Sequence, residues 1–262
     1  MIKLLVTDLA GTLLDNDYKL PDFNKEALIN ARKRGIKIVL ATGKLIYSIL
    51  PIINTIGIKS PQITSFGSTI ITRDLKILNS KKIQKADYIE VVKVIKEKGY
   101  NPMVTLEDNI IYCEKEDHVM ELMKKSGEKV IKIDSIETEG FLKDVVSVSI
   151  ITKGNDLLGS YLTTNFSDKL QIIKPAEYFI CILNLGVSKG EALLSVAKLL
   201  DIKKEEIAVF GDSTNDMSMF NEAGLKIAVK NSHPDLLAKA DIVADKNSNN
   251  GVGKAVYEYI LN

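Results

Sequence analysis

Apolar, β-branched runs alternate with amphipathic segments in the first third of the chain. Three of these runs are predicted to be buried strands, namely residues 2–7, 36–41 and 62–65. The segments 23–34 and 44–56 between them have helical spacing, and Asp22 is a candidate N-cap for the first. A β-α-β-α-β order of this kind predicts a parallel sheet covered by helices on both faces.

The pattern changes near residue 80. Paired strands are predicted at 102–106, 109–113, 129–133, 145–152, 169–174 and 178–184, with helices at 86–98, 115–125 and 154–164. The first pattern resumes after Gly186, with strands at 206–210, 225–229 and 241–243 and helices at 188–200, 213–222, 234–239 and 252–260. We therefore expect a discontinuous α/β core, residues 1–80 plus 185–262, interrupted by an α+β lid domain over residues 81–184.

The composition argues against nucleic acid and membranes as binding partners. The 262 residues are 45% hydrophobic and 26% charged, with a formal net charge of +1, so no global field attracts nucleic acid or an anionic membrane. Cys113 and Cys181 each lie in an apolar run and are predicted to be buried rather than reactive. The start of the chain does not resemble a signal peptide, and no apolar run approaches the roughly 20 residues that span a bilayer. We expect a cytoplasmic protein, and the sequence indicates no oligomeric state.

Polar side chains gather where the predicted core strands end. Asp8 follows the first strand and Thr42 the second, while Asp212 and Asp216 follow the strand at 206–210 and Lys189 begins a core helix. Ligands of open parallel sheets bind beyond the carboxyl ends of the strands, so these five side chains are expected to lie close together.

This set of side chains suits phosphate chemistry. Three clustered carboxylates repel one another unless a cation lies among them, and an oxygen-rich site with room for water favours Mg²⁺. A carboxylate that attacks phosphorus needs that cation and a fixed positive side chain, a role that suits Lys189. Thr42 offers a hydrogen bond to a phosphoryl oxygen. Each residue alone is more often structural, but the complete set in this order is rarely so.

Four segments resemble the motifs of the haloacid dehalogenase superfamily, and most closely those of its Cof-type branch: Asp8–Leu14, Ala41–Lys44, Gly186–Gly190 and Gly211–Asp216. Three C-terminal segments are also similar to that branch: Val229–Ser232, Ala240–Asp241 and Asn250–Val252. The resemblance implies a Rossmann-like, doubly wound core with a cap inserted between the second and third motifs. It also implies an enzyme that hydrolyses small phosphorylated metabolites, with sugar phosphates as the default class.

The resemblance assigns a role to each matching position. Asp8 becomes the nucleophile that carries an aspartyl phosphate. Mg²⁺ would be held by Asp8, the backbone carbonyl of Ala10, Asp212 and Asp216. The substrate and its phosphoryl group would be held by Thr42, Gly43, Lys44, Lys189, Asn215 and Asn231.

Ala10 departs from the family pattern, which has an aspartate there that protonates the leaving oxygen and later activates water. Loss of such a group typically removes about 10²–10⁴ in rate. Three readings stay open: an inactivating replacement, a slow or substrate-restricted phosphatase, or a phosphate-binding sensor without turnover. A phosphonatase-like hydrolase of C–P bonds is a further alternative, although the short segment between Asp8 and Thr42 leaves no room for the cap of that enzyme.

Two further positions differ from the Cof-type pattern. Lys44 stands where arginine is usual, and Phe66 stands where asparagine usually precedes glycine. Lysine provides a point charge without the bidentate geometry of arginine. Both differences predict altered handling of the part of the substrate beyond the phosphate.

Overall fold

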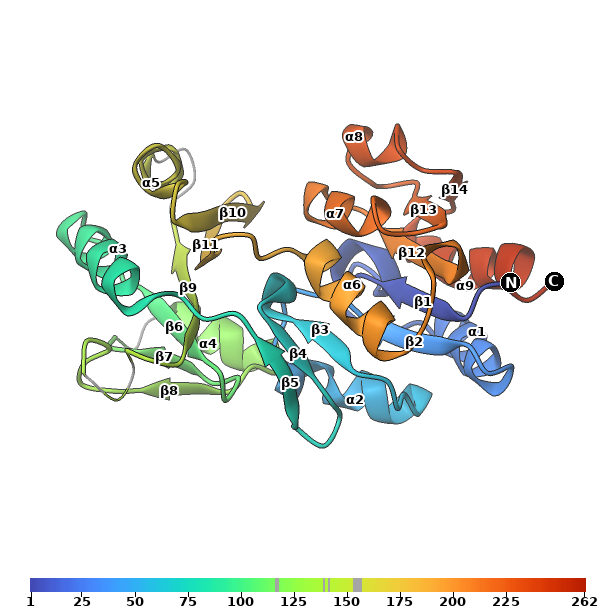
Figure 1. The fold of residues 1–262 in the computed structure, drawn as a ribbon, viewed down its shortest axis with the longest axis horizontal. Coiled ribbons are helices and arrows are strands. Elements are labelled where there is room, and N and C mark those ends of the chain that lie inside the picture. The colour runs from blue at the N-terminus through green and yellow to red at the C-terminus, as the bar shows by residue number, and fades with distance from the viewer. Residues whose placement is uncertain (116–117, 139, 141, 153–156) are drawn as a thin grey trace. The chain divides into compact units, whose positions relative to one another are not determined.

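The computed structural model describes residues 1–262 except 116–117, 139, 141 and 153–156 (Figure 1). Its contacts divide the chain into two units. The first comprises Met1–Gly43, Ile49–Leu78 and Ser188–Asn262, and the second comprises Lys44–Ser48 and Asn79–Val187. Within the described ranges, no helix is long and apolar enough to cross a membrane.

The first unit contains a five-stranded parallel sheet with the order β14-β13-β12-β1-β2. Its strands are β1 (Leu4–Thr7), β2 (Lys37–Leu40), β12 (Ile207–Gly211), β13 (Leu225–Val229) and β14 (Ile242–Ala244). Because β1 lies between β2 and β12, the chain winds outward from β1 in both directions. The predicted doubly wound α/β core is confirmed. Folds of this kind bind ligands beyond the carboxyl ends of the strands, next to the strand where the winding direction changes, which here is β1.

Helices cover both faces of this sheet (Figure 1). The side chains of Leu4 and Val6 point to one face and pack with α6 (Lys189–Leu199) and α7 (Met217–Phe220). On the other side, α1 (Asp22–Lys33) contacts β2 and α9 (Gly251–Ala255). Strands buried on both sides explain why their sequences are continuously apolar rather than alternating.

Two details differ from the sequence prediction. The third strand, β3 (Gln62–Thr64), joins the parallel sheet only through a bridge between Ala41 and Ile63. It pairs antiparallel with β4 (Thr69–Ile71) in a separate sheet with β5 (Ile77–Ser80), because a tight turn at residues 65–67 sends the chain back beside itself. The proposed cap at Asp22 is also wrong, since Pro21 occupies the N-cap and Asp22 is the first residue of α1.

The remaining helices of the first unit are short or irregular. Helix α2 (Ile46–Ile56) contains Pro51, and its first residues, up to Ser48, group with the second unit. Helix α8 (Pro234–Leu237) begins with proline, whose fixed φ suits the first turn. The helical path of α9 continues through residues 256–260.

The second unit is an α+β domain built on a six-stranded sheet with the order β10-β11-β9-β6-β7-β8. These strands are β6 (Met103–Leu106), β7 (Ile111–Cys113), β8 (Val130–Lys132), β9 (Val145–Ile151), β10 (Leu170–Ala176) and β11 (Phe179–Asn184). The helices are α3 (Lys85–Glu97), α4 (His118–Lys125) and α5 (Leu158–Phe166). The predicted hairpin between β6 and β7 is confirmed. The predicted helix starts at 115 and 154 run into 116–117 and 154–156, which lie outside the described residues.

Asn24 joins three separated segments of the first unit. Its buried side-chain amide donates to the carbonyl oxygen of Leu13 (2.9 Å) and accepts from the backbone N–H of Gly253 (2.8 Å). The replacement Asn24→Ala leaves both backbone groups buried without a partner. We expect a loss of about 2 to 5 kcal/mol of unfolding free energy, measured by urea unfolding. The exposed Asn54→Ala in α2 serves as control, and an equal effect of the two replacements would contradict this role.

Candidate active site

A tight loop follows β1 and carries the first acidic residue of the site. Asp8 directly follows the strand, and the chain then turns until the backbone N–H of Leu14 donates to the carbonyl of Leu9 (2.9 Å). Gly11 has a φ of 78°, and a side chain there would overlap with the carboxylate of Asp212. Glycine therefore lets the loop approach the end of β12 closely.

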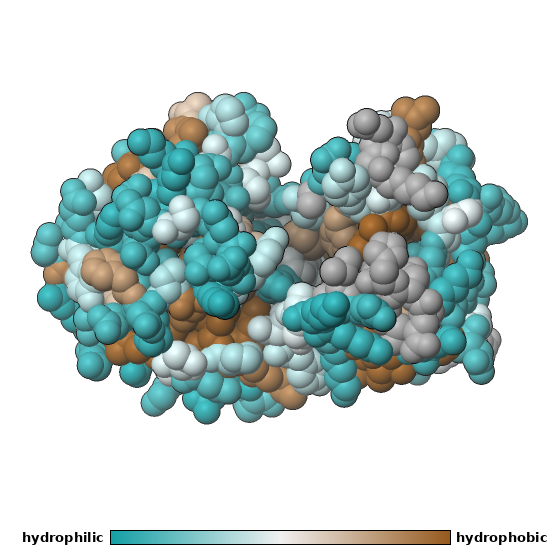
Figure 2. Space-filling view, turned by 180° about the vertical axis from the view of Figure 1, so that it is seen from behind, coloured by the Kyte–Doolittle hydropathy of each residue, from teal (hydrophilic) through white to brown (hydrophobic). Residues whose placement is uncertain are grey.

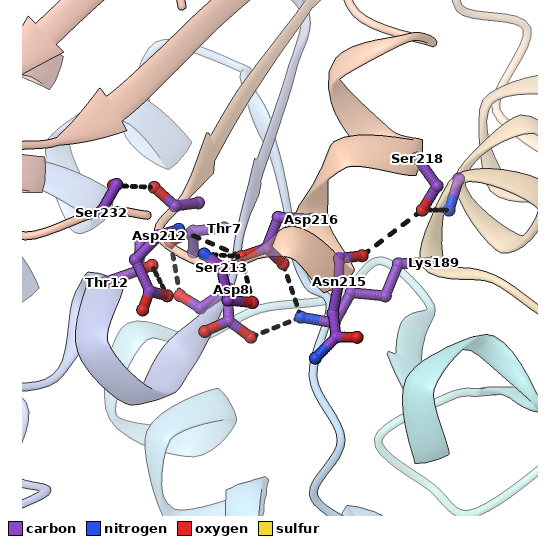
Figure 3. Close-up of polar contacts among 12 residues, drawn as sticks. Thr7, Asp8, Thr12, Lys189, Asp212, Ser213, Asn215, Asp216, Ser218 and Ser232 are labelled. Atoms are coloured by element: carbon purple, nitrogen blue, oxygen red, sulfur yellow. Dashed lines mark hydrogen bonds and ion pairs between the residues drawn. The ribbon is translucent and has the colours of Figure 1, made fainter. Parts of the chain in front are cut away.

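Lys189 lies between two carboxylates of the acidic cluster, those of Asp8 and Asp216 (Figure 3). Its Nζ lies 2.6 Å from Oδ1 of Asp8 and 2.7 Å from Oδ1 of Asp216, and the residue is only 3% exposed. The ammonium is positioned by the first turn of α6, where the hydroxyl of Ser188 accepts from the backbone N–H of Glu191 (3.1 Å). A helix start fixed in this way holds the lysine stem rigidly.

Asp216 is fully buried and uses both of its carboxylate oxygens within the protein. Oδ1 accepts from Lys189, and Oδ2 accepts from the backbone N–H groups of Asp212 and Ser213, each at 3.0 Å. The Oδ1 atom of Asp212 accepts from the hydroxyl of Thr12 (2.7 Å). Asp216 therefore fixes the loop after β12 and the position of Lys189.

The cluster carries more negative than positive charge. Asp8, Asp212 and Asp216 each place a carboxylate oxygen within 4.8 Å of the others. Burial raises the pKa of Asp8 to about 7, with Lys189 opposing the shift and the two other carboxylates adding to it. Burial and the charge of Asp216 raise the pKa of Asp212 to about 6. Burial opposes the charged form of Lys189, but Asp216 and Asp8 outweigh it and raise the pKa of that ammonium. A hard divalent cation fits this excess of oxygen ligands.

The end of β2 provides the predicted threonine. Thr42 is buried, its N–H donates to the carbonyl of Ile63 (3.0 Å), and its carbonyl accepts from the N–H of Phe66 (3.1 Å). Gly43 leaves space for the ring of Phe66, with which a side chain at position 43 would overlap. Lys44, next in the chain, groups with the second unit.

Two predicted asparagines differ in their surroundings. The side chain of Asn231 is held at both ends, since Nδ2 donates to the carbonyl of Gly11 (2.8 Å) and Oδ1 accepts from the N–H of Asn247 (2.9 Å). It ties the loop after β13 to the loop after β1. Asn215 is half-buried in the loop that contains Asp216, and its backbone carbonyl accepts from the hydroxyl of Ser218 (3.4 Å; Figure 3).

Sequence reasoning missed Thr12 and Asn247. Asn247 lies in a polar, low-complexity stretch that resembles an ordinary surface loop, yet its side chain is buried and donates to the carbonyl of Leu14 (2.9 Å). Thr12 had a usable signal, because a hydroxyl four residues after Asp8 follows the first strand as closely as the other site residues do.

Ala10, at the position where an aspartate was expected, is exposed. It lies on a hollow of about 410 Å³ whose lining is Ala10, Gly11, Asp15, Asn16, Tyr18 and Asn247. Alanine supplies no proton to this space. Two residues of chain span at most about 7 Å, so the position lies within reach of a group bound at Asp8.

The chain matches the family model described as haloacid dehalogenase-like hydrolase over residues 5–256. Among curated relatives, the 5-amino-6-(5-phospho-D-ribitylamino)uracil phosphatase YcsE of Bacillus subtilis is 26% identical, over 99% of this chain and 96% of that protein. The phosphatase YwpJ of the same organism is also 26% identical, over 96% and 97%. A solved haloacid dehalogenase-like hydrolase from Bacteroides thetaiotaomicron has the same fold, with a TM-score of 0.89 at 22% identity over 98% of this chain and 99% of that one.

The raised pKa values of Asp8 and Asp212 predict how stability depends on pH in protein freed of divalent cations. Between about pH 4 and pH 7 the folded state holds protons that the unfolded state has released, so stability falls as pH rises through this range. We expect the thermal unfolding midpoint of EDTA-treated protein to drop from about pH 5 to about pH 8, and Mg²⁺ to reverse the drop at the higher pH. The double replacement Asp8→Asn with Asp212→Asn should flatten the profile. Identical profiles for parent and variant would contradict the charge excess.

Proposed function

This chain belongs to the haloacid dehalogenase-like hydrolases, and on that premise we propose that it is a Mg²⁺-dependent phosphatase that transfers a phosphoryl group to Asp8. The observation that carries the proposal is the buried Lys189 held between Asp8 and Asp216, with Asp212 beside them. A nucleophilic carboxylate, a fixed cation and a second carboxylate available to a metal are the groups that phosphoryl transfer needs.

Each residue has a distinct role in this proposal. Asp8 attacks phosphorus, and Lys189 holds it in place and offsets the charge on the phosphoryl oxygens. Thr42 donates a hydrogen bond to one of those oxygens from the end of β2. When bound at Asp8, Asp212 and the carbonyl of Ala10, with Asp216 supporting the site, Mg²⁺ would neutralise the charge that carboxylates and phosphate bring together.

Small phosphorylated metabolites are the proposed substrates, with sugar phosphates as the default class. Phosphorylated precursors of cofactors are a second class, because one relative is a phosphatase of 5-amino-6-(5-phospho-D-ribitylamino)uracil. Lys44, Asn215 and Asn231 are proposed to act on the substrate directly or through their neighbours. Asn231 and Asn247 make three hydrogen bonds to the loop after β1 and one to each other, which favours a positioning role for Asn231.

Ala10 slows both chemical steps of the proposed reaction. With no acid at this position, the leaving oxygen of a weakly acidic alcohol departs with a full negative charge. Cleavage of such an ester is therefore slow. With no base there, water attacks the aspartyl phosphate slowly in the second step. A phosphate-binding sensor that keeps the site without turnover is the alternative function that Ala10 favours.

Restoring the missing carboxylate tests this account. The replacement Ala10→Asp should raise turnover of a sugar phosphate such as glucose 6-phosphate by about 10²-fold or more. It should raise turnover of an aryl phosphate less, because a phenol-like oxygen leaves without a proton. The measurement is phosphate release by both proteins from both substrates in the presence of Mg²⁺.

Ala10→Ser serves as a control that adds a polar group without an acid of suitable pKa. Equal and fast hydrolysis of the sugar phosphate by the parent and by Ala10→Asp would show that another group, such as Asp15 in the same hollow, supplies the proton. Inactivity of both proteins on every phosphate ester would favour the sensor instead.

Metal binding provides a separate test. Asp212→Asn removes one charged oxygen ligand and should weaken Mg²⁺ binding by about tenfold or more, as measured by calorimetry. Asp17→Asn, an exposed carboxylate in the loop after β1, is the matched control and should leave the affinity unchanged. Unchanged affinity in Asp212→Asn would remove this residue from the metal site.

A further inference from the structure

The turn between β3 and β4 holds an aromatic residue in a strained backbone conformation. Ser65, Phe66 and Gly67 have φ values of 49°, 57° and 103°, so three consecutive residues lie in the left-handed region. For a residue with a Cβ this conformation costs roughly 1–2 kcal/mol, and glycine alone adopts it freely. Phe66 keeps this conformation only because its surroundings fix it.

Two segments of the proposed phosphate site, one at Thr42 and one at Ser188, hold this turn in place. The N–H of Phe66 donates to the carbonyl of Thr42 (3.1 Å), so the turn is bonded to the end of β2. Gly67 packs against the carbonyl of Ser188 so closely that a side chain at position 67 would overlap with it. The turn therefore lies between Thr42 and the start of the helix that carries Lys189.

The ring of Phe66 has a defined place within this arrangement. Its outer carbons lie over Gly43, which follows Thr42 directly. Ser65 and Gly67 are buried, whereas Phe66 is half-buried, so Phe66 keeps accessible surface while its ring packs on one of the residues that are proposed to hold the phosphoryl group. A flat apolar surface at this position suits the group attached to the phosphate more than the phosphate itself.

We propose that Phe66 is a specificity-determining residue that favours phosphate esters whose ester oxygen is bonded directly to a flat conjugated ring. This inference rests on the proposed phosphoryl transfer to Asp8 and replaces the default class of sugar phosphates with aryl phosphates as the preferred substrates of the same site. The backbone of Phe66 is bonded to Thr42 and its ring lies over Gly43, so the ring is next to the residue that is proposed to hold a phosphoryl oxygen.

Ala10 independently points to the same class of substrate. In the first step an oxygen of Asp8 bonds to phosphorus, and the bond from phosphorus to the ester oxygen breaks with its electron pair on that oxygen. An aryl oxygen carries this charge as a phenolate and takes its proton from water after release. An alkyl oxygen needs the proton during the step, and Ala10 has none to give.

The test compares two substrates with acidic leaving groups, phenyl phosphate with a ring and acetyl phosphate without one. Phe66→Leu should lower kcat/KM for phenyl phosphate about 3- to 10-fold, from the typical strength of a ring–ring contact. It should change kcat/KM for acetyl phosphate less than about twofold. Phe23→Leu, an exposed ring on α1, is the matched control and should alter neither value.

A binding measurement without turnover accompanies the kinetics. Calorimetry with Mg²⁺ should show that the parent binds phenylphosphonate more tightly than methylphosphonate, and that Phe66→Leu removes most of the difference. Phe66→Asn provides a second variant without the ring, because asparagine tolerates the left-handed conformation. It should fold at least as stably as the parent and show the same selective loss.

The possible results distinguish a failure of the role of Phe66 from a failure of the proposed phosphatase activity. Equal losses on both substrates, or no preference of the parent for phenylphosphonate, would make the ring a space-filling residue and overturn this inference while the phosphatase stands. If the parent neither hydrolysed a phosphate ester nor bound a phosphonate, the proposed function and the role of Phe66 would fall together.

Discussion

A buried ammonium between two buried carboxylates organises the first unit of this protein. Lys189 contacts Asp8 at the end of β1 and Asp216 in the loop after β12, so one ion pair network joins three segments that are far apart in sequence. Truncating one partner of such a pair leaves an uncompensated buried charge, which typically destabilises a protein by about 3–5 kcal/mol. The network therefore fixes the relative positions of β1, β12 and α6 as well as the chemistry at their ends.

The surroundings of this network are shaped so that loops approach it closely. Gly11 lets the loop after β1 pass beside Asp212, and Gly67 lets the turn after β3 pack on the start of α6. Asn231 and Asn247 also hold the first of these loops, through its carbonyl groups at Gly11 and Leu14. Every group of the proposed phosphate site is thus present except the proton donor, and the proposed preference for acidic leaving groups follows from that one position. Figure 2 shows one face of the molecule, on which hydrophilic residues predominate and apolar residues appear in patches among them.

Much of this arrangement could be predicted from the sequence. Continuous apolar strands such as Leu4–Thr7 mark a parallel sheet, and the ends of parallel strands converge, so Asp8, Asp212 and Asp216 were expected together. The failures have local causes. The reversal after β3 depends on positive φ values that no propensity assigns to phenylalanine, and Pro21 rather than Asp22 occupies the N-cap position of α1. The burial of Asn247 depends on contacts with residues more than 200 positions away, which a local pattern does not contain.

The central claim is that Asp8 accepts a phosphoryl group, and peptide mass spectrometry tests it most directly. The protein is mixed with acetyl phosphate and Mg²⁺, quenched in acid and digested, with Asp8→Asn treated in parallel. Because Ala10 provides no base to activate water, the account predicts that a phosphoryl group accumulates on the peptide that contains Asp8, and that Asp8→Asn shows none. Consumption of acetyl phosphate with no phosphoryl group on that peptide, or equal labelling of both proteins, would contradict the account.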